Sequence, residues 1–111
     1  GVKDLGPRYK CFETSAPVGP WIVPKDQIED CYKLGMQFRI NGKVVQEGNT
    51  SNLVFTIPRI LSEVSEYHAL RPGDIICTGG PGATQNIQVG DIIEAVIEGI
   101  GTLRNPVKLE D

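Results

Sequence analysis

An alternation of apolar and polar residues predicts a β-hairpin in the middle of the chain. From Leu34 to Ile40 every second residue is apolar, as in a strand that has one face toward water. Asn41 and Gly42 follow, and both tolerate the positive φ angles of a tight type I′ turn. Residues 43–46 would form the returning strand. The pattern therefore predicts an antiparallel hairpin centred on Asn41-Gly42.

A different periodicity predicts one helix within residues 57–67. The apolar residues of this segment recur at the spacing of a single helical face: Ile57, Ile60, Leu61 and Val64. Thr56 and Pro58 stand where the start of a helix would place them. Glu63 and Glu66 would face water.

Shorter segments complete the predicted fold class, which is mainly β with one helix (α+β). An apolar run at residues 75–78 predicts a short strand, and residues 91–99 and 103–108 predict the closing strands. Residues 79–82, Gly-Gly-Pro-Gly, can only form a loop between them. A chain of 111 residues has room for one domain.

The composition and charge of the chain argue against several classes of protein. The chain is 40% apolar and 23% charged, which is typical of a folded domain and not of a disordered tail. The net charge is −3 with scattered Lys and Arg, which argues against a nucleic-acid-binding protein. No apolar run reaches the roughly 20 residues of a membrane span, and no targeting leader is visible at Gly1. Cys11, Cys31 and Cys77 contain no CxxC pair, so buried free thiols in a reducing cytoplasm are expected.

The Gly-rich loop at residues 79–82 is the one feature of the sequence whose residue types suggest ligand binding. A phosphate-binding loop would need a helix directly after it, and residues 83–91 lead instead to another turn. A nucleotide-binding domain therefore ranks far behind the other hypotheses. Two interpretations stay open: a plain connection, or a small-molecule pocket lined by the Thr78 hydroxyl and the Gly79 amide, where a ligand can approach the backbone.

Other single residues favour structural roles. His68, the only histidine, has no acid or thiol motif near it and is interpreted as structural. Trp21, the only tryptophan, is interpreted as a core anchor. By pattern alone Lys10 is an ordinary surface lysine. The residues by themselves therefore contain no complete catalytic set.

Four stretches, in order along the chain, resemble the fumarylacetoacetate hydrolase family. Residues 10–23 (KCFETSAPVGPWIV) are similar to its GKSFDT…P.GPW.V stretch, and residues 41–52 (NGKVVQEGNTSN) to its NG…Q.GNTSDM segment. Residues 70–79 (LRPGDIICTG) resemble its L.PGDII.TG signature, and residues 89–105 its GD.V.V.IEGIG.L.N ending. Departures are Glu13, where the family favours Asp, and Gly80, where its signature has a second Thr.

The resemblance implies a fold, a reaction class and a metal. The family folds as a distorted β-roll or barrel, and its members cleave or rearrange acylpyruvates, β-diketo acids and other 2-oxo acids, as in aromatic catabolism. Hydrolases, lyases (decarboxylases), isomerases and hydratases share this scaffold. A Glu-x-Glu pair and an Asp would hold Mg²⁺, or Mn²⁺ or Ca²⁺, in an oxygen-only shell. The cation would stabilise the enolate that forms as the C–C bond breaks.

The resemblance also assigns roles to single residues. Lys10 matches the catalytic lysine, whose ammonium neutralises developing negative charge. Thr78 and Gly79 match substrate-binding positions, and Gln46 matches a position that faces the pocket in some members. Thr14 matches a threonine beside the metal shell, in the second shell at most.

The three metal-binding carboxylates of the family precede the stretch that begins at Lys10, so they would lie before Gly1. Residues 1–111 are therefore expected to be the C-terminal portion of a single catalytic domain, inactive and without a metal when alone. A homodimer, or association with the missing N-terminal half, would complete it. The expected ligand is a 2-oxo or β-diketo acid, with no nucleic acid or membrane partner, in the cytoplasm or, given a missing signal, the mitochondrion. The alternative is a non-catalytic β-roll module for binding or structure.

Overall fold

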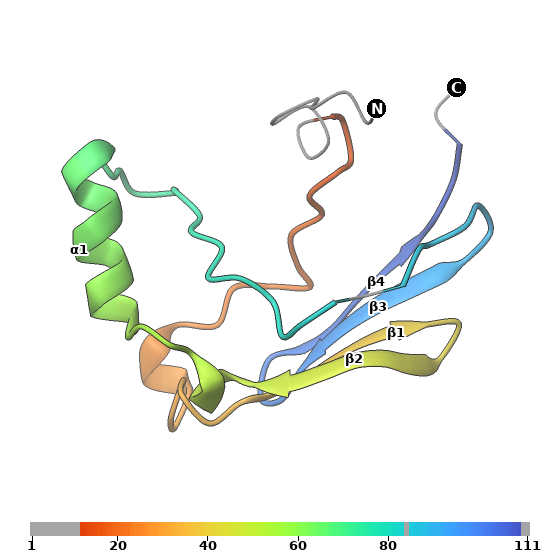
Figure 1. The fold of residues 1–111 in the computed structure, drawn as a ribbon, viewed down its shortest axis with the longest axis horizontal. Helices are drawn as coiled ribbons and strands as arrows, with labels where there is room; N and C mark the ends of the chain where they lie inside the picture. Colours follow the sequence, from red (N-terminus) through yellow and green to blue (C-terminus); the bar gives the residue numbers. More distant parts are fainter. Residues whose placement is uncertain (1–11, 84, 110–111) are drawn as a thin grey trace.

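A four-stranded antiparallel sheet forms the centre of the computed structural model, which describes residues 12–83 and 85–109. The strands lie in the order β2-β1-β3-β4, and one α-helix stands apart from them (Figure 1). This arrangement confirms the predicted fold class, mainly β with one helix. The elements are the 3₁₀ turns η2 (Lys25–Gln27) and η3 (Thr50–Asn52), the helix α1 (Ile57–Tyr67), and the strands β1 (Gly35–Ile40), β2 (Lys43–Asn49), β3 (Ile92–Ile97) and β4 (Gly101–Pro106).

The predicted hairpin is confirmed by the pairing of β1 with β2. Asn41 and Gly42 form its turn with φ angles of 51° and 80°, the two positive values that a type I′ turn needs. The Asn41 side chain also joins the hairpin to the neighbouring strand. Its Nδ2 donates to Asp91 Oδ1 at 2.8 Å, and its Oδ1 accepts from the N–H of Ile92 at 2.9 Å. One side chain therefore fixes the turn beside the start of β3.

The register gives the sheet one apolar and one polar face, because alternate residues of a strand point to the same side. Phe38 of β1 is flanked by Gln46 of β2 and Ala95 of β3, and Ala95 pairs in turn with Leu103 of β4. This face carries most of the large apolar side chains of the sheet. Two loops lie against it: Pro20-Trp21 beside Gly101, and Pro81 beside Gly48. The opposite face carries charged pairs such as Glu94–Arg104.

The predicted helix is confirmed with the expected bounds. Thr56 occupies the N-cap position and Pro58 lies in the first turn. The hydroxyl of Tyr32 accepts a hydrogen bond from the N–H of Ile57 at 3.0 Å, which satisfies one of the free donors at the helix start. On the outer side Arg59 and Glu63 form an ion pair at 3.0 Å. In the described part of the chain, no helix has the length and apolar character of a membrane span.

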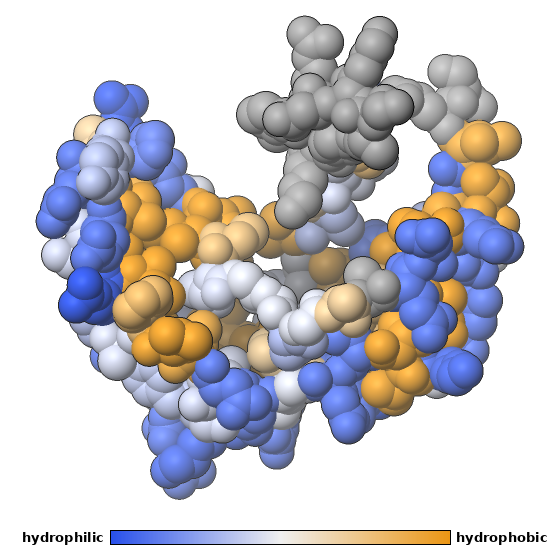
Figure 2. Space-filling view, in the orientation of Figure 1, coloured by the Kyte–Doolittle hydropathy of each residue, from blue (hydrophilic) through white to orange (hydrophobic). Residues whose placement is uncertain are grey.

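The apolar side of α1 faces a hollow between the helix and the sheet (Figure 2). Extensive contacts between elements occur only within the sheet. Leu61 stays 42% exposed and Phe55, just before the helix, 56% exposed. None of the described residues is fully buried. The apolar surfaces of the helix and the sheet thus remain accessible in the described part of the chain.

Three expectations about the interior are wrong. Residues 75–78 form no strand, since no described strand runs beside them to pair with their backbone, and Ile75 is 65% exposed. Trp21 is not buried in a core: it is 63% exposed and covers Gly101 with one edge of its ring. Cys31 is a half-buried free thiol and Cys77 is an exposed one, because the segment that carries Cys77 crosses the hollow outside the sheet.

Acid is expected to weaken the junction between the hairpin and β3. The pKa of Asp91 is lowered, first by a hydrogen bond from the N–H of Gln88 and then by the bond from Asn41. A carboxyl group with a lowered folded-state pKa stabilises the fold above its unfolded pKa, near 4, and this contribution is lost as the pH falls through the folded-state pKa. Asp91→Asn should therefore flatten the loss of stability in acid.

Urea unfolding of the native polypeptide between about pH 2 and pH 6 measures this effect. Asp26→Asn is the matched control, since Asp26 is an exposed aspartate of the 3₁₀ turn η2. An unchanged slope in Asp91→Asn would show that the hydrogen bonds of Asp91 contribute nothing to the acid response.

Candidate functional site: a glycine-rich loop docked on strand β2

The Gly-rich loop at residues 79–82 lies against β2, where it meets one of the residues predicted to bind substrate. The Nε2 of Gln46 donates to the carbonyl oxygen of Pro81 at 3.1 Å and to that of Gly82 at 2.7 Å. The structure therefore brings Gln46 together with the loop that begins at Thr78 and Gly79. We call residues 78–82 the TG loop.

A second contact between β2 and the TG loop involves Gly48, which sequence reasoning missed. A Cβ atom at Gly48 would lie 2.5 Å from the Cβ of Pro81 and 2.8 Å from its Cγ, so only glycine lets the proline ring approach this closely. A glycine inside a strand is the signal that could have revealed the contact, because it marks a place where another chain segment comes near. Gly48 and Gln46 are two residues apart and thus lie on the same face of β2.

Thr78 and Gly79 are both exposed at the start of the TG loop. Gly79 has a φ of 95°, in the left-handed region that favours glycine. A hydroxyl and a backbone N–H next to it can both donate hydrogen bonds to a carboxylate or carbonyl oxygen. The loop therefore offers donors for an anionic ligand, and a strand fixes its position.

The two remaining predicted site residues come before the loop in sequence. Thr14 is exposed in the turn of residues 12–15, with a positive φ of 64°. The predicted catalytic lysine, Lys10, lies outside the described residues. The catalytic role that the family resemblance implies for Lys10 thus stays a prediction.

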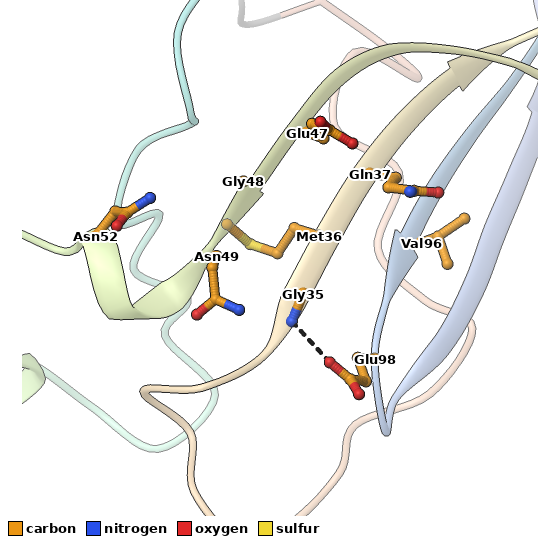
Figure 3. Close-up of a pocket in the computed structure, with 9 residues that line it drawn as sticks. All are labelled: Gly35, Met36, Gln37, Glu47, Gly48, Asn49, Asn52, Val96 and Glu98. Atoms are coloured by element: carbon orange, nitrogen blue, oxygen red, sulfur yellow. Dashed lines mark hydrogen bonds between the residues drawn. The ribbon is translucent and has the colours of Figure 1, made fainter.

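A groove of about 620 Å³ opens on the polar side of the sheet, where β1, β2 and β3 meet (Figure 3). Glu47 and Glu98 bring carboxylates to it, and the Glu98 side chain accepts a hydrogen bond from the N–H of Gly35 at 3.1 Å. These two negative charges oppose the binding of an acidic ligand there. The TG loop, which presents hydrogen-bond donors, is therefore the better candidate for an acid.

A divalent cation needs ligands that the described residues do not supply. Among them, no three His, Cys, Asp or Glu side chains lie close enough together to hold a metal ion. The residues at the TG loop offer a hydroxyl and amides, whereas Mg²⁺ and Mn²⁺ prefer carboxylate oxygens. The described part of the chain does not fit a metal centre.

Residues 4–108 match the family described as fumarylacetoacetate (FAA) hydrolase C-terminal. One relative is the 4-hydroxyphenylacetate degradation bifunctional isomerase/decarboxylase of Salmonella dublin, 38% identical over 94% of this chain and 24% of its own length. Another is the mitochondrial oxaloacetate tautomerase of Mus musculus, 42% identical over 89% of this chain and 44% of its own. The chain spans less than half the length of these relatives.

The fold is also found in a solved structure, the maleylpyruvate hydrolase of Sphingobium sp. SYK-6 in complex with manganese(II) and pyruvate. Its TM-score to this chain is 0.81 at 37% identity, and the match covers 86% of this chain and 36% of the hydrolase. Sequence and structure agree on the same group of enzymes. The chain belongs to the fumarylacetoacetate hydrolase family.

Proposed function

We propose that this chain carries the substrate-contacting TG loop of a metal-dependent enzyme that cleaves or rearranges 2-oxo or β-diketo acids. One observation carries the proposal: β2 holds, through Gln46 and Gly48, a loop whose first two residues, Thr78 and Gly79, are both exposed. The names of the relatives support the reaction class, since they include a hydrolase, a tautomerase and an isomerase/decarboxylase that act on acids or in their degradation.

In this proposal the chain's own residues bind and polarise the substrate. Thr78 and Gly79 donate hydrogen bonds to its carboxylate or carbonyl oxygen, which orients the acid and withdraws electron density from the carbon skeleton. The ammonium group of Lys10 neutralises negative charge that develops on the substrate oxygens. The cation, Mg²⁺ or Mn²⁺, would take its carboxylate ligands from residues other than those described here.

Location and assembly complete the proposal. Cys31 and Cys77 are free thiols, which suits a reducing compartment such as the cytoplasm. The open apolar surfaces of α1 and the sheet suit a protein that associates with a second copy or with further residues of its own polypeptide. The ligand is a small acid.

Turnover of 2-oxo acids by the native polypeptide tests the proposed function. Maleylpyruvate hydrolysis, oxaloacetate tautomerisation and oxaloacetate decarboxylation are measured with Mg²⁺ or Mn²⁺, after EDTA, and after the metal is restored. We expect turnover of at least one acid, its loss in EDTA and its return with metal. A protein that binds the metal and turns over none of these acids would support the alternative, a non-catalytic β-roll module.

Calorimetric titration of the isolated 111 residues with Mg²⁺ or Mn²⁺ is a separate prediction. We expect no tight stoichiometric site, because the described residues offer no group of three ligands for a metal. Lys10 would add a positive charge that repels a cation. A tight site with one ion per chain would contradict this expectation and locate the metal ligands within these residues.

A further inference from the structure

We propose that Gln46 is a positioning residue that holds the TG loop in its binding geometry, rather than a residue that touches substrate. This inference rests on the proposed function, because it assigns to Gln46 the task of presenting Thr78 and Gly79 to the acid. It concerns β2 and the loop alone and needs no metal.

The side-chain amide of Gln46 is already engaged. An amide nitrogen has two N–H donors, and those of Gln46 Nε2 are used by two carbonyl oxygens, Pro81 O at 3.1 Å and Gly82 O at 2.7 Å. Two acceptors at the same atom also fix the orientation of the amide, since an oxygen there would face two oxygens. No donor is left on Gln46 for a substrate carboxylate.

The TG loop requires such an anchor because its own backbone is permissive. Gly79 and Gly82 have φ angles of 95° and 82°, and glycine loses more conformational freedom on ordering than any other residue. Within the loop the only backbone hydrogen bond seen among the described residues runs from the N–H of Gly82 to Gly80 O, at 3.0 Å. The contacts with β2 must therefore supply most of the order.

Gly48 sets the distance at which the loop is held. The Pro81 ring lies over Gly48 where no side chain fits, while Gln46 binds the carbonyl oxygens of two consecutive residues, Pro81 and Gly82. The hydrogen bonds from Gln46 draw the TG loop toward β2, and the contact of the Pro81 ring with Gly48 limits how close it can come. Together they define one position of the loop. The contact of Pro81 and Gly82 with β2 therefore also positions Thr78, at the start of the same loop.

Gln46→Glu tests the inference because one variant can be compared at two pH values. Above its pKa the new carboxylate faces two carbonyl oxygens and repels them, whereas in acid the protonated form can donate one hydrogen bond. We expect KM for the acid substrate to rise about tenfold or more near pH 8 and the difference from wild type to shrink near pH 5, with kcat changed less. Gln46→Leu should raise KM at both pH values.

Gln85→Glu is the matched control, because it adds the same charge to an exposed side chain a few residues beyond the loop. It should leave KM and its pH profile unchanged. If Gln46→Glu and Gln46→Leu leave KM at the wild-type value, or if Gln85→Glu gives the same pH dependence as Gln46→Glu, the positioning role is overturned.

A second pair of variants moves the loop without touching Gln46. Gly48→Ala places a methyl group in the space of the Pro81 ring, so the loop must shift, and KM should rise as in Gln46→Leu. Gly35→Ala is its control on β1, where the new methyl group would meet only the flexible side chain of Glu98, with Oε2 at 3.2 Å and Cβ at 4.0 Å. Pro81→Gly, added to Gly48→Ala, removes the clashing atoms and should reverse part of the rise in KM.

Hydrogen exchange separates failure of this inference from failure of the proposed function. The backbone N–H groups of Gly79, Gly80, Gly82 and Ala83 should exchange faster in Gln46→Leu and Gly48→Ala than in wild type, while those of β1 and β3 keep their rates. If wild type turns over no 2-oxo acid but the loop amides respond in this way, the proposed function fails and the anchoring of the loop stands. Unchanged loop exchange in both variants would overturn the inference whatever the enzyme does.

Discussion

Replacing Lys10 by methionine is expected to lower turnover of the 2-oxo acid substrate by about 10²–10³-fold, the usual effect of removing one group that stabilises charge in the transition state. Methionine keeps an unbranched apolar stem and removes the ammonium group. In the proposed function, the charge that this group would neutralise grows as the substrate becomes enolate-like, so kcat and kcat/KM should fall together. Steady-state kinetics of the native polypeptide with its metal give both values.

Lys43→Met is the control for this substitution. Lys43 is an exposed lysine at the start of β2, beside the hairpin turn. It should leave kinetics and unfolding unchanged, and Lys10→Met should leave unfolding nearly unchanged as well. Full activity in Lys10→Met would show that Lys10 is an ordinary surface lysine, which is the interpretation its isolated position in the sequence first favoured.

Thr78→Val is expected to act on substrate binding instead of turnover. Valine keeps the shape of threonine and removes the hydroxyl group that we place against the substrate. A hydrogen bond to a charged group contributes about 1.5–3 kcal/mol, so KM should rise roughly 10- to 150-fold where it reports affinity. The effect on stability should be small, because Thr78 is exposed and lies outside the sheet.

Thr102→Val provides the comparison, since Thr102 is an exposed threonine on β4. It should alter neither KM nor the urea midpoint. The opposite result for Thr78→Val, a lower urea midpoint with an unchanged KM, would mean that this hydroxyl serves the fold and not the ligand. Both quantities are measured on the same preparation of each variant.

Elements with a strong local signal could be predicted from the sequence. The Asn41-Gly42 turn and helix α1 depend on nearby residues: two that accept positive φ, and four apolar positions on one helical face. Neither needs distant partners to define its type. The apolar run at residues 75–78 shows the limit of this reasoning. A strand needs a neighbour, and neighbours are not encoded in the run itself.

The candidate site, too, could be predicted from the sequence only in part. Thr78 and Gly79 stood out because a hydroxyl and a backbone N–H are adjacent there, at a glycine with no side chain to block a ligand. The contact of Gln46 with Pro81 and Gly82 joins residues 35 and 36 positions apart, and no periodicity connects them. Gly48 lies two residues beyond the predicted returning strand, residues 43–46, and only the structure places it within β2. Its meaning depends on a proline that the fold alone brings close.

The strand order β2-β1-β3-β4 has a consequence for folding kinetics. It consists of two local hairpins, each able to form within about 1–10 μs, joined by a single long-range ladder between β1 and β3. That ladder is the pairing with the highest contact order, so we expect its formation to limit the folding rate. Loop-closure entropy rises only slowly with length, by about 0.6 kcal/mol for each doubling. The segment that connects β2 to β3 can therefore vary in length at little cost in free energy of folding, while the two hairpins keep the sheet intact.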